Sequence, residues 1–506
     1  MEIKKIIESS GEDNFWLTFD DVLILPSYSE VIPRDVELKT KLTNNINLEI
    51  PLVSSDMDTV TGPEMAEAIA KQGGIGFLWK HPDAKIQAGW VESVKYALNA
   101  LIDRPVTIRY DKTKKDAIET FPKYKNRFST LVVIDEENRV VGLVTRDRIQ
   151  FAKDTDLVKS FMIKDPVILD QDLGVKEAYE FMIENKISKL ILVNPNKTLK
   201  GLYCFNDVKS IIEGADPFNR DERGQLRVGA NVGIRTNDNF QKFDERVKLL
   251  LKEHCDVLLV GTAHGHSKNV IETVKYLNGL KSTNKFDIVA GNVVTYEGAK
   301  TLFEAGADCV KVGVGPGSIC TTRVVSGAGA PQITAICEVT KAGREFGKPV
   351  IADGGIKYSG DITKAIAAGA DSVMLGGLLA GTEEAPGEII MYEGQKFKEY
   401  RGMGSLGAMK DYGGERYGKK GEKDKLVPEG IEGRVPIKGT VKDVLFQLMG
   451  GLRSGMGYAG AKNILELKSR KFIRVTSASL KESHPHGVLM IKESPNYQPE
   501  KEERRE

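Results

Sequence analysis

The sequence predicts an α/β protein built around a closed barrel of eight parallel strands. Eight short apolar runs rich in β-branched residues recur along the chain, most with Gly, Asp or Ser near their C-terminal ends. They lie at 50–55, 74–78, 226–232, 256–261, 287–292, 309–314, 349–354 and 372–377. Nearly continuous apolar strands suit a parallel sheet that is buried on both faces. Eight strand–helix units are what a (β/α)8 TIM barrel needs, whereas an open doubly wound sheet gives no reason to stop at eight.

The segments between these runs have helical periodicity. Residues 297–308 (EGAKTLFEAGAD) and 359–371 (SGDITKAIAAGAD) combine an Ala-rich face with a Gly near the C-terminal end, as is typical of helix caps. In a TIM barrel the active site lies at the C-terminal ends of the strands. The glycines and polar residues of this sequence gather at those ends, so we expect the site there.

The composition excludes several classes of protein. The 506 residues hold 72 Lys+Arg against 71 Asp+Glu, so no basic domain indicates nucleic-acid binding. No segment has the ~18 consecutive apolar residues of a spanning helix, and the charged N-terminus does not resemble a signal peptide. We therefore expect a cytoplasmic protein with no membrane partner. Five cysteines without a CxxC pair predict reduced thiols, and 51 glycines predict close approach of the backbone to a ligand.

The spacing between the second and third predicted strands is too long for one helix. Residues 97–214 contain a tandem repeat, in which DRPVTI is matched by KDPVIL and VVGLVTRDRI by LKGLYCFNDV. We assign the barrel to 1–96 and 215–480, and the two repeats to 97–154 and 160–214.

A second interruption covers residues 384–434, which are rich in Gly and charge and poor in periodic apolar residues. A segment this long without a core-forming pattern is usually a functional lid or a disordered linker. Residues 481–506 form a separate C-terminal segment that ends in a solvated tail.

The loop VKVGVGPGSICTTR at 310–323 carries the strongest chemical signal. Its glycines leave backbone N–H and C=O groups bare, so they can enclose a phosphate or a cation. Cys320 lies at the end of this loop among polar residues, unlike Cys309, which lies in an apolar run. A thiol at the catalytic face is a candidate nucleophile, and a buried structural cysteine is the alternative.

Several motifs occur in a characteristic order: PLVSSDMDTVT (51–61), GPGSICTTR (315–323), YRGMGSLGAM (400–409), ERYG (415–418), LVPEGIEGRVP (426–436) and ESHPH (482–486). With these motifs the chain resembles the IMP dehydrogenase family over nearly its whole length. The resemblance implies NAD+-dependent oxidation of inosine 5′-monophosphate (IMP) to xanthosine 5′-monophosphate, the committed step of guanine nucleotide synthesis. Cys320 would bond to C2 of the purine. Arg416, Tyr417 and Thr322 would then assist hydrolysis of the adduct.

The resemblance also implies the binding residues. The contacts to IMP would come from Ser55, Met57, Ser318, Asp353, Gly354, Gly355, Gly376, Gly377, Tyr400, Arg401, Gly402, Met403, Gly404 and Glu429. NAD+ would lie against Gly261, Gly313, Val314 and Gly315. A monovalent cation, K+, would be held by Gly315, Gly317 and Cys320 with Glu482, Ser483 and His484 of a neighbouring subunit, which implies a homotetramer. Formation of an octamer through the inserted module stays open.

The inserted repeats resemble a tandem CBS (Bateman) module, which in many enzymes binds adenine or guanine nucleotides. In that family a Thr and an Asp hold the ribose, and Thr145 and Asp147 match them in the first repeat. The second repeat has Asp207, preceded by Cys204 and Phe205. The alternative is a module that only packs against its partners.

The sequence departs from the family at two positions. Family members usually carry an Asp where this chain has Gly261, and the carboxylate binds the nicotinamide ribose. Asp56 stands where the family usually has Pro, Ala or another small residue. We therefore expect weak NAD+ binding that improves on Gly261→Asp.

Two other functions remain open. GMP reductase shares the barrel, the cysteine loop and the covalent intermediate, but it releases ammonia and has no water to activate. The ERYG and LVPEGIEG segments therefore favour the dehydrogenase. A non-catalytic nucleotide sensor with an impaired NAD+ site is the third reading, against which the retention of Cys320, Asp353, Arg416 and Tyr417 weighs.

Overall fold

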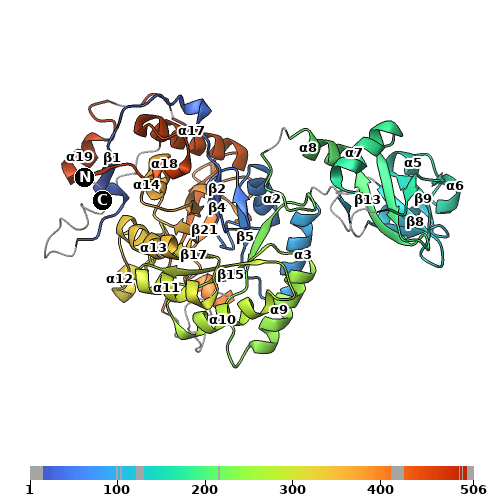
Figure 1. The fold of residues 1–506 in the computed structure, drawn as a ribbon, viewed down its shortest axis with the longest axis horizontal. Coiled ribbons are helices and arrows are strands. Elements are labelled where there is room, and N and C mark those ends of the chain that lie inside the picture. The colour runs from blue at the N-terminus through green and yellow to red at the C-terminus, as the bar shows by residue number, and fades with distance from the viewer. Residues whose placement is uncertain are drawn as a thin grey trace. The chain divides into compact units, whose positions relative to one another are not determined.

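The computed structural model describes residues 15–97, 101–102, 105–120, 130–171, 173–214, 217–411, 427–488, 490–492 and 494–497. The chain forms two compact units (Figure 1), one of Met1–Glu92 with Arg227–Glu506 and one of Ser93–Leu226. Each unit has its own hydrophobic core.

The first unit contains a closed parallel barrel whose strands follow one another in chain order. They are β4 (Leu52–Ser54), β5 (Ile75–Leu78), β14 (Val228–Asn231), β15 (Val257–Gly261), β16 (Asp287–Val293), β17 (Cys309–Val312), β18 (Val350–Asp353) and β19 (Ser372–Leu375). All eight coincide with the eight predicted runs, so the predicted fold class is confirmed. Nearly every strand residue is buried, which explains why the runs are continuously apolar.

A helix follows each strand on the outside of the barrel. These helices are α2 (Pro63–Lys71), α3 (Ala84–Lys95), α9 (Phe240–Lys252), α10 (Lys268–Leu280), α11 (Tyr296–Ala305), α13 (Gln332–Phe346), α14 (Ser359–Ala367) and α17 (Val441–Ala459). Figure 1 shows α9, α10, α11 and α13 side by side around the strands. Helix α11 begins where the Thr295 side chain accepts a hydrogen bond from the Gly298 amide. It ends at Gly306, whose φ of 109° needs a glycine.

A hairpin closes the N-terminal end of the barrel. Strands β2 (Thr40–Lys41) and β3 (Asn47–Leu48) place Leu42, Ile46 and Leu48 in the same buried cluster as the inward-facing residues of the barrel strands. The hydroxyl of Thr43 donates to Asp287, the first residue of β16, at 2.5 Å. Apolar side chains therefore fill the N-terminal end of the barrel, so a ligand pocket can form only at the C-terminal ends of the strands.

The second unit consists of two four-stranded sheets. One has the order β10 (Ile163–Lys164), β9 (Val140–Thr145), β8 (Thr130–Ile134) and β7 (Thr107–Arg109). The other has the order β11 (Ile168–Leu169), β12 (Lys189–Val193), β13 (Leu199–Cys204) and β6 (Leu101–Ile102). Helices α4 (Lys114–Thr120), α5 (Arg146–Gln150), α6 (Val158–Phe161), α7 (Val175–Glu184) and α8 (Phe205–Ile212) complete the unit. Because β6 pairs with β13 and β10 with β9, each sequence repeat adds a strand to the sheet of the other, and the two interlock.

The segment 384–434, in which the sequence shows no periodic pattern, contains regular structure in its described part. Strands β20 (Ile389–Tyr392), β21 (Gln395–Arg401) and β22 (Glu432–Pro436) form an antiparallel sheet, and α16 (Leu406–Asp411) follows β21. All four residues of β20 are exposed, so no alternation of buried and exposed positions marks this strand in the sequence.

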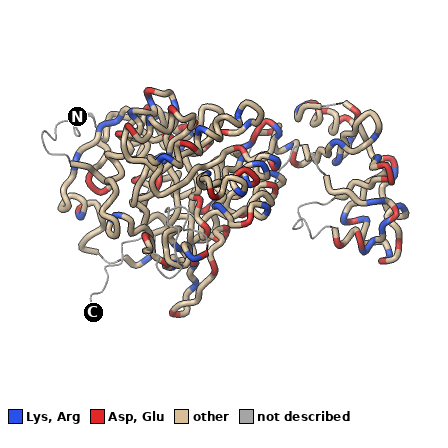
Figure 2. Tube along the Cα trace, turned by 90° about the horizontal axis from the view of Figure 1, so that it is seen from below, with Lys and Arg blue, Asp and Glu red and all other residues tan. Residues whose placement is uncertain are grey.

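Short elements complete the first unit. They are the 3-10 helices η1 (Phe19–Asp21) and η2 (Pro33–Asp35), the pair β1 (Val22–Ile24) with β23 (Phe472–Arg474), and the helices α12 (Thr322–Ser326), α15 (Gly377–Ala380), α18 (Ile464–Leu467) and α19 (Ser477–Glu482). Among the described residues, no helix combines the length and apolar character needed to cross a membrane. Acidic and basic residues are interspersed along both units (Figure 2).

Candidate active site

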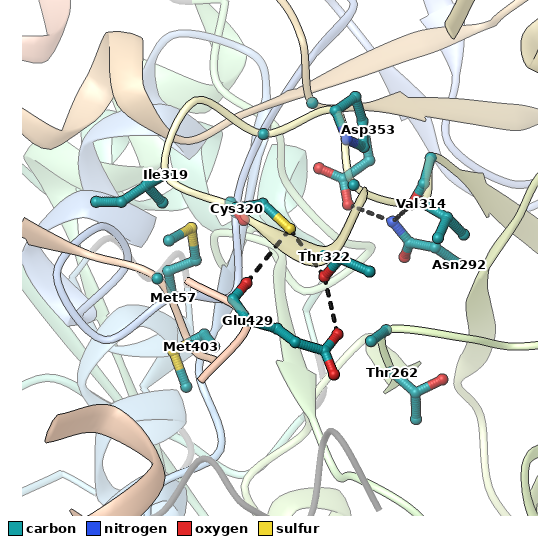
Figure 3. A pocket seen from close by; sticks show the side chains of 18 of the residues that line it. Met57, Thr262, Asn292, Val314, Ile319, Cys320, Thr322, Asp353, Met403 and Glu429 are labelled. Atoms are coloured by element: carbon teal, nitrogen blue, oxygen red, sulfur yellow. Dashed lines mark hydrogen bonds between the residues drawn. The ribbon is translucent and has the colours of Figure 1, made fainter. Parts of the chain in front are cut away.

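A pocket opens where the barrel strands end, as the sequence predicts for a TIM barrel. Its walls border about 720 Å³ of space, which includes open solvent at the mouth of the pocket. Among the residues with predicted roles, those lining it are Ser55, Met57, Gly313, Val314, Gly315, Gly317, Cys320, Thr322, Asp353, Gly354, Tyr400, Gly402, Met403 and Glu429. Figure 3 shows Cys320 with Met57, Met403 and Ile319 on one side and Asp353 and Asn292 on the other.

Glycines shape the loop that carries Cys320. Gly313 has φ 141°, and a Cβ there would lie 2.2 Å from the carbonyl oxygen of Asp353. Gly315 has φ 73°, and its Cβ would lie 2.6 Å from Cγ of Arg323. Arg323 donates from Nε to the Val314 carbonyl at 3.0 Å and so closes the loop. Both the conformation and the space therefore demand glycine at these two positions.

A chain of hydrogen bonds connects the thiol of Cys320 to a carboxylate. Its Sγ donates to Oγ1 of Thr322 at 3.1 Å, and Thr322 donates to Oε2 of Glu429 at 3.0 Å (Figure 3). All five cysteines are free thiols. Cys320 is half-buried, whereas the other four are buried: Cys204, Cys255, Cys309 and Cys337. Burial raises the pKa of the Cys337 thiol to about 12 and that of Cys309 well above its usual value. Only Cys320 combines exposure to the pocket with a route for its proton.

Backbone pairing fixes Glu429 beside the cysteine loop. The Thr321 amide donates to the Glu429 carbonyl at 3.0 Å, and the Ile431 amide donates to the Ile319 carbonyl at 3.0 Å. On its other side the Gly402 amide donates to the Ile431 carbonyl at 3.0 Å. The segments around 320, 402 and 429 therefore lie side by side, although they are far apart in the sequence.

Asp353 ends strand β18 and faces the pocket. Its Oδ2 accepts hydrogen bonds from Nδ2 of Asn292 at 2.8 Å and from Nζ of Lys311 at 2.5 Å. None of the described residues donates to its Oδ1. Two donors on one oxygen fix the rotation of the carboxylate and leave the second oxygen for a ligand.

Ser318, Tyr400, Gly376 and Gly377 meet next to the pocket. A Cβ on Gly376 would lie 3.1 Å from Oη of Tyr400, and a Cβ on Gly377 would lie 3.1 Å from Oγ of Ser318. Burial raises the pKa of Tyr400, and a hydrogen bond with Ser318 partly offsets the rise. Two hydroxyls thus face bare backbone here, an arrangement that suits an anion.

Some residues with predicted roles lie next to the pocket or farther from it. Gly261, Ser318, Gly355, Gly376, Gly377, Arg401 and Gly404 are not among the lining residues. The Arg401 guanidinium instead donates from Nε to the buried Asp58 at 2.7 Å and from Nη2 to Asp411 at 3.2 Å. Glu482, Ser483 and His484 lie at the end of α19, where His484 Nδ1 is 3.1 Å from Oη of Tyr497. Arg416 and Tyr417 lie outside the described residues.

The two repeats of the second unit place their candidate residues differently. Thr145 ends β9 and Cys204 ends β13, and helices α5 and α8 follow directly. Counted from these strand ends, Asp147 corresponds to Asn206, and Asp207 lies one residue further along. Burial raises the pKa of Asp207, and the charges of Lys189 and Arg220 oppose the rise. The two repeats are therefore not equivalent at this position.

The structure adds lining residues to which the sequence analysis gave no role. They are Thr262, Ala263, Asn292, Pro316 and Ile319. Asn292 had a usable signal, because it is a polar residue near the end of the predicted strand at 287–292. Thr262 and Ala263 follow β15 directly and border the pocket with Val314. In the described part of the chain, no three His, Cys, Asp or Glu side chains form a metal site.

Known proteins share both the sequence and the fold. A family model described as the IMP dehydrogenase / GMP reductase domain matches residues 16–486. The chain belongs to the IMP dehydrogenase / GMP reductase family. It is 50% identical to inosine-5′-monophosphate dehydrogenase of Aquifex aeolicus, over 95% of this chain and 97% of that protein. The same enzyme of Bacillus subtilis is 47% identical, over 95% of this chain and 97% of that protein.

Among solved structures of this family, a GMP reductase of Trypanosoma brucei bound to guanosine 5′-monophosphate is similar with a TM-score of 0.87. It is 41% identical to this chain, and the match covers 95% of this chain and 100% of that one. Membership of the family accounts for the barrel, the glycine-rich cysteine loop and the pocket between them.

Proposed function

We propose that this chain oxidises IMP to xanthosine 5′-monophosphate with NAD+, through a covalent bond between Cys320 and C2 of the purine. The hydrogen-bonded chain from Cys320 through Thr322 to Glu429 carries the proposal, because it gives the thiol proton a path to a carboxylate. The relatives named inosine-5′-monophosphate dehydrogenase, which are 45–50% identical over nearly the full length, support the same substrate.

Binding of IMP begins with the ribose and the phosphate. The free Oδ1 of Asp353 accepts hydrogen bonds from ribose hydroxyls, since Oδ2 is already used. Ser318 and Tyr400 present hydroxyls to the phosphate, and the amides of Gly355, Gly376 and Gly377 reach it without interference from side chains. The purine would then lie against Ser55, Met57, Gly354, Met403 and Glu429, which line the pocket, with its C2 next to Sγ of Cys320.

The first chemical step joins Cys320 to the purine. The Cys320 proton passes to Glu429 by way of Thr322, Sγ bonds to C2, and the C2 hydrogen leaves with its electron pair. NAD+ is the hydride acceptor in this step. Thr262, Ala263, Gly313 and Val314 line the pocket with Cys320 and would hold the nicotinamide of NAD+. The product of the step is a thioimidate on Cys320.

The second step is hydrolysis. Arg416 and Tyr417, on the flap within 384–434, activate a water with the help of Thr322. The water oxygen bonds to C2 as the C–S bond breaks. One water proton passes to the Arg416/Tyr417 pair and then to solvent, and the other goes to a purine ring nitrogen. The departing Cys320 thiolate recovers its proton from Glu429 through Thr322. Arg401, Gly402 and Gly404 belong to the described part of the same 384–434 segment. The ion pairs of Arg401 with Asp58 and Asp411 support its role as an anchor of that segment.

K+ and self-association complete the proposal for the barrel. Gly315, Gly317 and Cys320 belong to one loop, in which the Cys320 amide donates to the Gly317 carbonyl at 3.1 Å. The carbonyl oxygens of this loop would be the ligands of the monovalent cation. Glu482, Ser483 and His484 of a neighbouring subunit would complete its shell in a homotetramer.

The second unit is proposed to be a CBS pair that binds a purine nucleotide at Thr145 and Asp147. These residues lie at the start of α5, and the interlocked sheets support two related repeats. Asp207 is the weaker position because it is displaced by one residue. A GMP reductase structure of Trypanosoma brucei with guanosine 5′-triphosphate, 36% identical to this chain, makes GTP the first nucleotide to test.

One assay tests the reaction. Purified protein is mixed with IMP, NAD+ and K+, and formation of NADH is followed by its absorbance. The expected result is K+-dependent NADH formation with an equal amount of xanthosine 5′-monophosphate. Absence of NADH in a folded protein that binds IMP would contradict the proposal.

GMP reduction is the second candidate, because the similar solved structures are GMP reductases. The same protein is therefore mixed with GMP and NADPH, and consumption of NADPH and release of ammonia are measured. Turnover here without turnover of IMP would establish the reductase instead. A protein that turns over neither nucleotide but binds one would be a sensor.

A further inference from the structure

Asp56 and Gly261 are far apart in the sequence but adjacent in the barrel. Oδ2 of Asp56 accepts a hydrogen bond from Nδ2 of Asn231 at 2.5 Å. A Cβ on Gly261 would lie 2.8 Å from that Nδ2 and 3.1 Å from that Oδ2. The carboxylate of Asp56 and the amide of Asn231 therefore fill the space that a side chain at position 261 would enter.

Space, and not backbone conformation, requires glycine at 261. Gly261 ends strand β15 and is not among the glycines with positive φ. Asn231 cannot turn away freely, because its Oδ1 accepts a hydrogen bond from the Gly233 amide at 2.7 Å. A side chain at 261 and a carboxylate at 56 therefore compete for one space.

The Asp56 carboxylate also connects to Asp353. Nζ of Lys311 lies 3.8 Å from Oδ1 of Asp56 and 2.5 Å from Oδ2 of Asp353. The side chains of Asp56 and Lys311 are both 0% exposed, so water does not screen their attraction. The buried ammonium is thus held between two carboxylates, one behind the pocket wall and one facing the pocket.

We propose that Asp56 is a positioning residue, which occupies the space of a side chain at position 261 and acts on the nucleotide through Lys311 and Asp353. With Asp56 present, the Lys311 ammonium is shared and Asp353 keeps its charge for the ribose. Without that negative charge, Lys311 turns entirely toward Asp353 and weakens its hydrogen bonds to the ligand. Ser55 and Met57, the neighbours of Asp56 in the chain, line the pocket. The inference rests on the proposed function, in which Asp353 holds the ribose.

The variant Asp56→Asn tests the role of the charge, because it keeps the size and an oxygen for Asn231. Calorimetric titration with IMP alone should give a Kd about tenfold higher, equal to about 1.4 kcal/mol, while kcat changes by less than about threefold. Asp371→Asn is the matched control. Asp371 pairs with Lys468 at the other end of the barrel, so this variant should lower Tm but leave the Kd unchanged. An unchanged Kd in Asp56→Asn would overturn the proposal.

The variants Gly261→Asp, Asp56→Ala and the double variant test whether side chains at positions 56 and 261 compete for one space. Gly261→Asp alone should lower Tm and reduce kcat/KM for NAD+ at least about tenfold, since two buried carboxylates would meet. Adding Asp56→Ala should restore most of that loss, which two independent sites would not do. Additive losses of kcat/KM in the double variant would refute the competition for this space. This outcome for Gly261→Asp is opposite to the gain expected from the sequence.

Two further measurements distinguish a failure of the role of Asp56 from a failure of the proposed reaction. If Asp56→Asn does not fold, Gly261→Ala serves in its place, because its Cβ should displace Asn231 and Asp56 and raise the Kd for IMP. Turnover of IMP by the unchanged protein is measured in parallel. Absent turnover with intact binding would refute the proposed reaction, whereas unchanged binding in the variants would refute the role of Asp56.

Discussion

Aspartates at the two ends of the barrel do different work. At the N-terminal ends of the strands, three aspartates each stand directly before a strand: Asp256, Asp308 and Asp371. Each accepts a hydrogen bond from the first or second backbone amide of the preceding barrel strand, at 2.7–2.9 Å. At the C-terminal ends, Asp353 is the last residue of its strand and accepts both of its hydrogen bonds on one oxygen. The same side chain therefore closes the barrel at one end and remains available to a ligand at the other.

The difference shows how one architecture separates stability from chemistry. Asp371 accepts the Val350 amide on Oδ2 and pairs with Lys468 through Oδ1, so both of its oxygens are engaged in holding the barrel together. The polar groups at the other end are also hydrogen-bonded, but in a chain from Cys320 to Glu429 that a proton can follow. Substitutions at the two ends should therefore change different quantities.

The largest effect is expected for Cys320→Ala at the pocket end. Loss of the nucleophile should reduce kcat at least about 10⁴-fold, because no other thiol faces the pocket among the described residues. The Kd for IMP, measured by calorimetry, should change by less than about threefold. Cys337→Ala is the matched control, since that thiol is buried in α13 and should not affect turnover. Substantial activity in Cys320→Ala would exclude the covalent mechanism.

A smaller loss is expected for Glu429→Gln. The amide still accepts the hydrogen bond from Thr322 but cannot take the thiol proton, so kcat should fall about 10²-fold with little change in the Kd for IMP. Single-turnover measurement of NADH formation separates this step from hydrolysis. An unchanged rate of NADH formation would mean that the thiol proton leaves by another route.

The sequence reveals the barrel because its signals are local. Each buried parallel strand is a continuous apolar run, and the number of runs defines the architecture. The exchange of β6 and β10 between the two repeats leaves no such signal, because strand pairing depends on residues distant in the chain. Strand β20 is hidden for a different reason, since all of its residues are exposed.

The candidate site, like the fold, is predictable from the sequence where its signals are local. The glycine loop and Cys320 form one contiguous motif, so the sequence identifies them directly. Lys311 lies within an apolar strand, and only the fold reveals its contacts with Asp353 and Asp56. Asp56 and Gly261 likewise lie near the ends of two different strands. In the sequence they are two unrelated departures from the family pattern, whereas in the structure they share one space.

Asp353→Asn should affect ligand affinity more than rate. Loss of the charge weakens the hydrogen bonds to the ribose, and a loss of about 1.5–3 kcal/mol corresponds to a Kd for IMP about 10- to 100-fold higher. Saturating IMP should restore most of kcat, since the chain from Cys320 to Glu429 is intact. A fall in kcat that excess IMP does not relieve would place Asp353 in the chemical step instead.

The smallest effect on activity is expected at the opposite end of the barrel, for Asp308→Ala. The substitution leaves the Ile288 amide without its acceptor and Lys281 without its ion pair, which should cost about 2 kcal/mol of unfolding free energy. Thermal unfolding should therefore begin several degrees lower, while KM for IMP and kcat stay within about twofold at a temperature where the variant is folded. A change in KM without a change in Tm would mean that the N-terminal end communicates with the pocket. The division between the two ends would then fail, because a carboxylate that only ties strands together has no other means of reaching the nucleotide.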